Sequence, residues 1–158
     1  MNLAALYPTG ELRFEIRNPD GSVRARGRTP NRVLAAGRAH VAASLAGEVG
    51  NQRIAIVVGK DPSSPEDDSL RALLAQVAEL EAEKAGTDGE RLVVQAAWVA
   101  DAPQTLGESG VVLTYEQSGS RKKHQLLYNR AVLDPVEAIE AGETVTLTWT
   151  LSFGRHDA

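Results

Sequence analysis

The sequence predicts an α+β fold in which an antiparallel, β-sandwich-like core carries one or two packed amphipathic helices. Residues 145–153 alternate large apolar and small hydroxyl side chains, as a strand with one buried face does. Clusters of Asn, Asp, Gly and Pro separate other alternating stretches, which is typical of hairpins. The chain of 158 residues has no cysteine. At this length one domain, residues 1–158, can bury a core without disulfides.

The composition narrows the classes of partner. A formal net charge of −4 at pH 7 does not suggest a nucleic-acid-binding protein. No apolar run approaches the ~20 residues that a membrane-spanning helix needs. The beginning of the chain lacks the basic and apolar segments of a secretory signal. We therefore expect a soluble protein without nucleic-acid binding or membrane insertion.

The first expected element is a β-hairpin over residues 11–28. Leu12, Phe14 and Ile16 alternate with charged residues, and Asn18-Pro19-Asp20-Gly21 supplies a turn. The outward face combines Glu11 and Glu15 with five arginines, which are Arg13, Arg17, Arg24, Arg26 and Arg28. This basic patch is either a solvated hairpin face or a surface that docks onto an acidic neighbouring subunit.

An amphipathic helix is predicted over residues 30–46. Thr29-Pro30 offers an N-cap followed by proline at the first helical position, and Gly47 marks the end. The core-facing positions recur at helical spacing and are Val33, Leu34, Gly37, Val41 and Leu45. A glycine inside a helix is tolerable where another backbone packs closely against it.

Residues 53–153 are expected to be mainly β. Residues 53–59 form an apolar run of branched side chains, which is typical of a central strand buried on both faces. Further strands over residues 111–116 and 125–133 flank a polar loop and form a hairpin. Asp134-Pro135 is expected to end the second of these strands.

Residues 70–84 are ambiguous. Their apolar spacing is helical up to Val77 and then becomes alternating, so a short helix followed by a strand is the preferred interpretation. A single helix over the whole segment is the alternative. A turn at Thr87-Asp88-Gly89 then leads into a strand over residues 91–100, whose core side includes Trp98.

The closing strand, which follows a turn at Ala141-Gly142-Glu143, is expected to have two distinct faces. Its apolar face joins Trp98 in the predicted structural core, which comprises Trp98, Leu147, Trp149, Leu151 and Phe153. Its opposite face carries hydroxyl residues, among them Thr146, Thr148 and Thr150.

No motif points to catalysis, a metal or a cofactor. Gly59-Lys60 lacks the earlier glycine and the following hydroxyl residue of a phosphate-binding loop. The spacing of His40, His124 and His156 does not suit a metal site. Glu66-Asp67-Asp68 lacks the alternating ligands and glycine of an EF-hand. We therefore expect a non-enzymatic protein that holds neither cofactor nor metal.

An ordered set of motifs runs through the last four-fifths of the chain. Residues 53–59 form an I-A-x-G type strand, Glu108-Ser109-Gly110 a glutamate–glycine turn, and residues 127–136 an L-Y-x-R-x-x-x-x-P-V segment before the closing strand. The set resembles phage tail-fibre and baseplate-associated modules, although Val111-Val112 stands where that group usually carries Leu-Phe. The matching residues are Asn31, Gly59, Gly110, Tyr128, Arg130, Pro135, Trp149 and Phe153.

The resemblance implies a multicopy structural subunit of a phage tail or a related contractile injection particle. Its expected location is the virion or particle, after assembly in the bacterial cytoplasm, and its expected partners are other tail proteins and copies of itself. The residues expected at subunit contacts are basic or hydroxyl-bearing, namely Arg13, Arg24, Arg26, Arg28, Arg121, Lys122, Lys123, Thr146, Thr148 and Thr150. The alternative function is a β-sandwich module that binds a glycan or another surface ligand.

Arg130 needs a partner of its own. It alternates with Tyr128 and Val132 on a predicted strand, so a buried guanidinium there must be satisfied by a carboxylate or by carbonyl groups. Glu108 and Asp134 are the candidate partners. The alternative is a charge at a sheet edge that reaches solvent.

Overall fold

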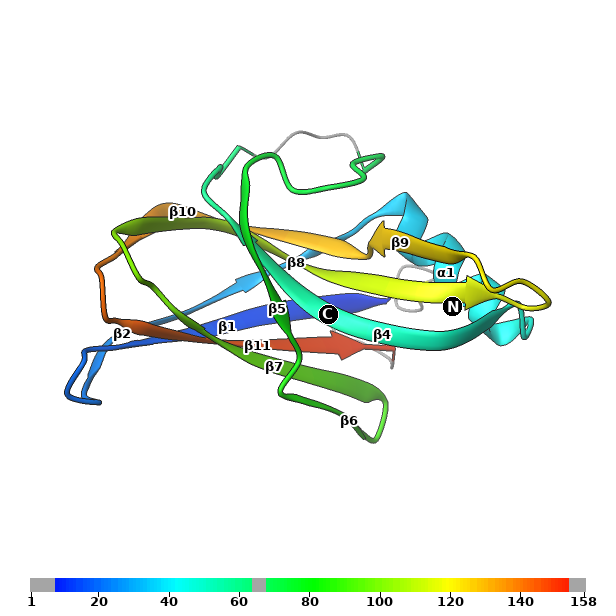
Figure 1. Ribbon diagram of the computed structural model, residues 1–158, viewed down its shortest axis with the longest axis horizontal. Coiled ribbons are helices and arrows are strands. Elements are labelled where there is room, and N and C mark those ends of the chain that lie inside the picture. Colours follow the sequence, from blue (N-terminus) through cyan, green and yellow to red (C-terminus); the bar gives the residue numbers. More distant parts are fainter. Residues whose placement is uncertain (1–7, 64–67, 154–158) are drawn as a thin grey trace, which may run out of the picture.

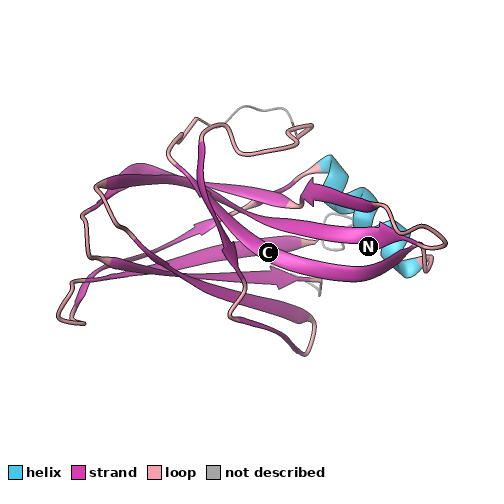
Figure 2. Ribbon diagram, viewed as in Figure 1, coloured by secondary structure: helices cyan, strands magenta, loops and turns pink. Residues whose placement is uncertain are grey.

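The computed structural model describes residues 8–63 and 68–153 and consists mostly of antiparallel β-strands with one short helix (Figures 1 and 2). The helix, α1 (Ala35–Leu45), lies beside strand β9 (Lys123–Leu127) near one end of the molecule. The strands form two sheets. The β-rich part of the sequence prediction is therefore confirmed.

The five-stranded sheet has the order β2-β1-β11-β7-β6. Its members are β1 (Thr9–Arg17), β2 (Val23–Pro30), β6 (Lys84–Asp88), β7 (Arg91–Val99) and β11 (Thr144–Ser152). The six-stranded sheet has the order β3-β10-β8-β4-β5, and β9 also pairs with β8. Its other members are β3 (Arg32–Val33), β4 (Val49–Gly59), β5 (Gln76–Glu81), β8 (Gln104–Gln117) and β10 (Asn129–Ile139).

The main core combines buried residues from both sheets. Leu147 and Trp149 of β11 belong to the same apolar cluster as Ile56 of β4. A second cluster contains Val57, the neighbour of Ile56, together with Leu34 before the helix. Successive residues of β4 therefore belong to different clusters, which confirms burial on both faces for residues 56–59, whereas Arg53 at the start of the predicted strand is exposed.

The chain passes from one sheet to the other at both edges. Edge strand β2 leads through Asn31 into β3, and edge strand β5 leads through Ala82 and Glu83 into β6. The Asn31 N–H donates to the Gly10 carbonyl, and the Glu83 N–H donates to the Gln95 carbonyl. The outermost strands of the two sheets are therefore joined by short, hydrogen-bonded connections, as at the corners where strands switch sheets.

The first hairpin is confirmed. Strands β1 and β2 pair antiparallel, with Phe14 opposite Gly27. A Cβ atom at Gly27 would lie 2.4 Å from Cζ of Phe14, so the absence of a side chain there makes room for the ring. Leu12 and Ile16, on the same side of β1, are fully buried.

The predicted helix is present, but its predicted start at residue 30 is wrong. Thr29-Pro30 ends β2, where Thr29 pairs with Leu12, so long-range strand pairing overrides the local capping signal. The helix begins at Ala35, and Leu45 is 86% exposed rather than part of the core. Gly37 does meet a neighbouring backbone, since a Cβ there would lie 2.3 Å from the Tyr128 carbonyl oxygen.

Both interpretations of residues 70–84 are wrong about a helix. Residues 70–75 have no regular secondary structure, and β5 begins at Gln76. The N–H groups of Leu74 and Ala75 donate to the side chain of Glu108 instead of forming helical hydrogen bonds. The strand expected between there and the turn at residues 87–89 is present but divided: β6 pairs with β7, as that turn predicts, whereas β5 pairs with β4 in the other sheet.

The strand predicted over residues 125–133 is divided at Tyr128. Strand β9 pairs with β8 through Leu127, and β10 resumes the pairing through Ala131 with a shifted register. Asp134-Pro135 does not end β10, because pairing continues to Ile139 after a further irregularity.

The closing strand alternates as expected. Of its predicted core residues, Leu147, Trp149 and Leu151 are at most 2% exposed, and Trp98 of β7 is 8% exposed. The prediction that Phe153 belongs to the core is wrong, because this residue follows the end of β11 and is 46% exposed.

Candidate interaction surface

The outer face of the five-stranded sheet carries a row of cationic and polar side chains. The register places Arg28 of β2 opposite Arg13 of β1, Arg13 opposite Thr148 of β11, Thr148 opposite Gln95 of β7, and Gln95 opposite Lys84 of β6. The Gln95 amide donates to the Thr148 hydroxyl over 3.3 Å. We call these five residues the cationic row; it crosses every strand of the sheet and contains no carboxylate.

An open depression of about 500 Å³ lies on this face. Most of its lining is charged or hydroxyl-bearing, and it brings together several residues that the sequence placed at subunit contacts: Arg13, Arg26, Arg28, Thr146 and Thr148. Gln95 and Glu15 complete the polar lining. Two surfaces proposed separately, the arginine face of the hairpin and the hydroxyl face of β11, are therefore one continuous surface.

Part of the arginine charge is already paired. Arg13 contacts Glu11 at 2.7 Å, and Arg26 contacts Glu15 at 2.8 Å. The Arg26 guanidinium, with Arg17 beside it, lowers the pKa of the Glu15 carboxyl below its ordinary value. These pairs are surface pairs, since the Arg13 and Arg26 side chains are 63% and 68% exposed. They leave both guanidinium groups accessible to another partner.

Two cations of the row, Arg28 and Lys84, form no ion pair within residues 8–63 and 68–153. Arg28 faces another arginine, Arg13, directly across the strand pair, and like charges in that position are unfavourable. The row is therefore electrostatically suited to an anionic partner.

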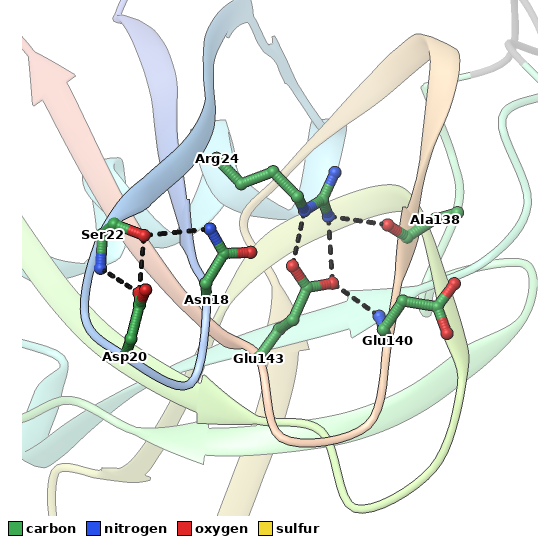
Figure 3. Close-up of polar contacts among 7 residues, drawn as sticks. All are labelled: Asn18, Asp20, Ser22, Arg24, Ala138, Glu140 and Glu143. Atoms are coloured by element: carbon green, nitrogen blue, oxygen red, sulfur yellow. Dashed lines mark hydrogen bonds and ion pairs between the residues drawn. The ribbon is translucent and has the colours of Figure 1, made fainter.

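Arg24 lies apart from this surface. It is the residue of β2 at which the register shifts, because Ile16 pairs with Ala25 and Arg17 with Val23. Its guanidinium donates to both carboxylate oxygens of Glu143 and to the Ala138 carbonyl, as Figure 3 shows. Arg24 therefore connects the first hairpin to the turn before β11 by hydrogen bonds. It does not line the depression.

Glu143 is held by more than one donor. Its carboxylate also accepts from the Glu140 N–H at 2.7 Å. The hydrogen bonds from Arg24 and then from Glu140 lower the pKa of Glu143, and the carboxylate correspondingly raises the pKa of Arg24. The neighbouring hairpin turn is closed separately by Asp20, which accepts from Ser22 (Figure 3).

A buried ion pair confirms the partner expected for Arg130. Its Nε atom lies 3.0 Å from Oε1 of Glu108, and both side chains are almost inaccessible. Glu108 also accepts backbone N–H bonds from Asp61, Leu74 and Ala75. The guanidinium Nη2 donates to the Asp61 carbonyl. This cluster connects the irregular segment before β5 to β8 and β10. Its charged side chains form their hydrogen bonds within the cluster.

A second hollow, of about 400 Å³, lies between α1 and the six-stranded sheet. His40 and Tyr115 line it in an edge-to-face contact with ring centroids 4.6 Å apart. His40 is 5% exposed, and its Nε2 lies 2.6 Å from Oε1 of Gln52. The basic residues Arg121 and Lys122 lie in the turn between β8 and β9, and Lys123 begins β9; none of the three lines either hollow.

Residues 8–63 and 68–153 contain neither a metal-binding cluster nor a membrane-spanning helix. No cluster of three or more His, Asp or Glu side chains there could hold a metal ion. Asp68 forms an ion pair with Arg38 at 2.6 Å, while Glu66 and Asp67 lie outside the described residues. In the same part of the chain, no helix has the length and apolar character required to span a membrane.

The comparisons with known proteins give no family. The chain matches no protein-family model, no curated protein and no solved structure. The likeness to phage tail modules therefore depends on the sequence motifs alone.

Proposed function

We propose that this protein is a non-enzymatic structural subunit of a phage tail or a tail-like contractile injection particle. It would act in the baseplate, the fibre attachment or another tail region, through contacts with copies of itself and with other tail proteins. In this proposal its two sheets form a β-sandwich, and assembly takes place in the bacterial cytoplasm. The ordered motifs from Gly59 to Trp149 support the choice of particle.

The single observation that carries the assembly role is the cationic row. Arg13 and Arg28 face each other at an exposed position, although a hairpin needs no such pair for its own stability. A surface that gains from an anionic neighbour explains this arrangement better than a face adapted to water alone. The depression beside Thr148 offers that neighbour a shaped surface as well as charge.

Purified particles provide the test. The chain should co-purify with tail or injection particles from cells that produce them, at a fixed ratio to the tube or sheath protein, as measured by mass spectrometry. Replacing Thr148 by arginine should leave the subunit folded but exclude it from particles, because a bulky side chain would then fill the depression. Thr87→Arg, the same change on exposed β6, is the control. Normal particle yield with Thr148→Arg, or a chain that is never found in particles, would contradict the proposal.

The alternative, a glycan-binding module, draws support from the same polar depression, whose hydroxyl, amide and guanidinium groups could hydrogen-bond to a sugar. Sugar sites commonly add an exposed aromatic platform, whereas Trp98 and Trp149 are buried here. Acrylamide should therefore quench the tryptophan fluorescence weakly, and glycans should not change that quenching. Strong quenching that a glycan then suppresses would favour the binding module instead.

A further inference from the structure

The six-stranded sheet carries an acidic stripe on its own outer face. Glu79 and Glu81 of β5 lie opposite Val57 and Ala55 of β4, and Val57 belongs to the apolar cluster outside the main core. Both glutamates are exposed. We call Glu79 and Glu81 the acidic stripe. Since β5 is the outermost strand of its sheet, the stripe is accessible from the side and from above.

We propose that the acidic stripe of one copy of this chain docks on the cationic row of a second copy. This inference rests on the proposed function in one respect, because it names the neighbour that the cationic row receives. The argument for it is charge complementarity between two exposed surfaces of the same molecule. Each surface has charges that remain available for a partner in the described structure.

The available charges lie on both sides of the contact. Arg28 and Lys84 form no ion pair among the described residues. Glu81 likewise forms none in that part of the chain, and Glu79 accepts a single hydrogen bond, from the Gln125 amide at 3.1 Å. Arg53 shares a shallow hollow with Glu79 and Glu81 and offsets part of their charge. A net attraction between stripe and row remains.

The dimensions of the two surfaces are compatible. Neighbouring strands lie about 4.8 Å apart, so a row across five strands extends over about 19 Å. Alternate residues on a strand lie about 6.7 Å apart, so Glu79 and Glu81 of β5 extend over about 7 Å. A β5 strand laid across the five-stranded sheet would therefore place both carboxylates within the length of the row. The Thr148 hydroxyl and the Gln95 amide between the cations can donate further hydrogen bonds.

The contact joins two different surfaces, which determines the kind of assembly. The two inner sheet faces share one core, so the cationic row and the acidic stripe lie on outer faces that point away from each other. A docked pair therefore leaves one row and one stripe unoccupied. Such a heterologous contact adds further copies and produces a ring where the rotation closes, or an open stack where it does not.

The test is sedimentation of the purified full-length chain with reciprocal charge reversals. Species larger than a dimer should form at about 0.02 M salt and dissociate at about 0.5 M salt, where screening is strong. Arg13→Glu/Arg28→Glu should weaken association at least tenfold, and so should Glu79→Lys/Glu81→Lys. A 1:1 mixture of the two variants should restore the large species, because each then supplies the charge that the other lacks. This recovery also shows that both variants are folded.

A matched control uses two exposed basic residues outside the row and the stripe, Lys60 and Arg91. Lys60→Glu/Arg91→Glu changes the net charge by the same amount as the reversal of the row. It should leave association unchanged. A wild-type chain that stays monomeric at low salt, a mixture that fails to recover, or equal loss with this control variant would each overturn the inference.

The outcomes separate this inference from the proposed function. Particles that incorporate the wild-type chain and both charge-reversal variants equally well would refute the contact while supporting the tail role. Reciprocal charge-dependent assembly of a chain that is never found in particles would support the contact and refute the tail role.

Discussion

The Glu108 carboxylate should be among the most sensitive positions for stability. Its Oε1 accepts from the Leu74 N–H and from Nε of Arg130, and its Oε2 accepts from the N–H groups of Ala75 and Asp61. In Glu108→Gln, one of these oxygens becomes an NH₂ group. Whichever way the amide is turned, two donors then face a donor instead of an acceptor, and the charge opposite Arg130 disappears.

The expected cost follows from these losses. Removing one partner of a buried ion pair typically costs about 3–5 kcal/mol, and each buried donor left unsatisfied costs about 1–3 kcal/mol. These effects act at one site and are not additive. We therefore expect Glu108→Gln to lower the free energy of unfolding by on the order of 3–5 kcal/mol. Arg130→Lys, which retains the charge but loses the fork shared by Glu108 and Asp61, should cost about 1–2 kcal/mol.

Urea denaturation followed by tryptophan fluorescence measures both effects. Glu90→Gln is the control, because the same substitution at this exposed turn residue removes no side-chain bond that the structure describes. The irregular segment over residues 68–75 should also become more sensitive to limited proteolysis in Glu108→Gln, since two of its N–H groups lose their acceptor. A change of less than about 1 kcal/mol in Glu108→Gln would refute the reasoning, because it would mean that the four donors find other partners.

Three further predictions concern the core and the charge network. Trp149→Ala should cost on the order of 3–5 kcal/mol in urea denaturation because the indole is fully buried, whereas Thr148→Ala on the opposite face should cost far less. Burial raises the pKa of Tyr128 to about 12, so its contribution to stability, present below pH 10, should be lost as the pH rises toward 12. Tyr128→Phe should remove this alkaline dependence in pH-resolved denaturation. The pKa of Glu143 is lowered by Arg24, so its contribution is present above pH ~4.5 and is lost as the pH falls below that value. Glu143→Gln should weaken the decrease in the free energy of unfolding at acid pH, and an unchanged pH dependence would count against a stabilising contact between Arg24 and Glu143.

Strands with a clear two-residue period were predictable from sequence. The closing strand and the first hairpin have alternating patterns together with turn residues at their ends, and both are found where expected. Their signals are local: each pattern is contained in fewer than ten successive residues, and each buried face follows directly from it. The expected partner of Arg130 was also found, because a buried guanidinium has few candidate carboxylates nearby.

The errors arise where distant contacts decide the local structure. Thr29-Pro30 has the chemistry of a helix start, yet Thr29 pairs with Leu12 in a strand. Residues 70–77 have helical spacing, yet the N–H groups of Leu74 and Ala75 donate to Glu108, more than thirty residues away. The partner in each contact lies far away in the sequence, so the local spacing of apolar residues in the segment does not reveal the contact.

The candidate surface was predictable in part for the same reason. Arginine and threonine residues such as Arg13 and Thr148 follow from the alternation of their own strands. Gln95 and Lys84 extend the row only because β6 pairs with β7 and β7 with β11. That register depends on strand order, which the sequence pattern does not specify.

The passage of the chain between sheets at both edges has a mechanical consequence. Separating the two layers would require more than parting their side chains, because continuous backbone joins β2 to β3 and β5 to β6. A load that pulls the layers apart is carried into the edge strands and must break main-chain hydrogen bonds before the core can open. A fold joined at both edges therefore resists separation of its two sheets, and a force applied to one sheet is transmitted through the backbone to the other.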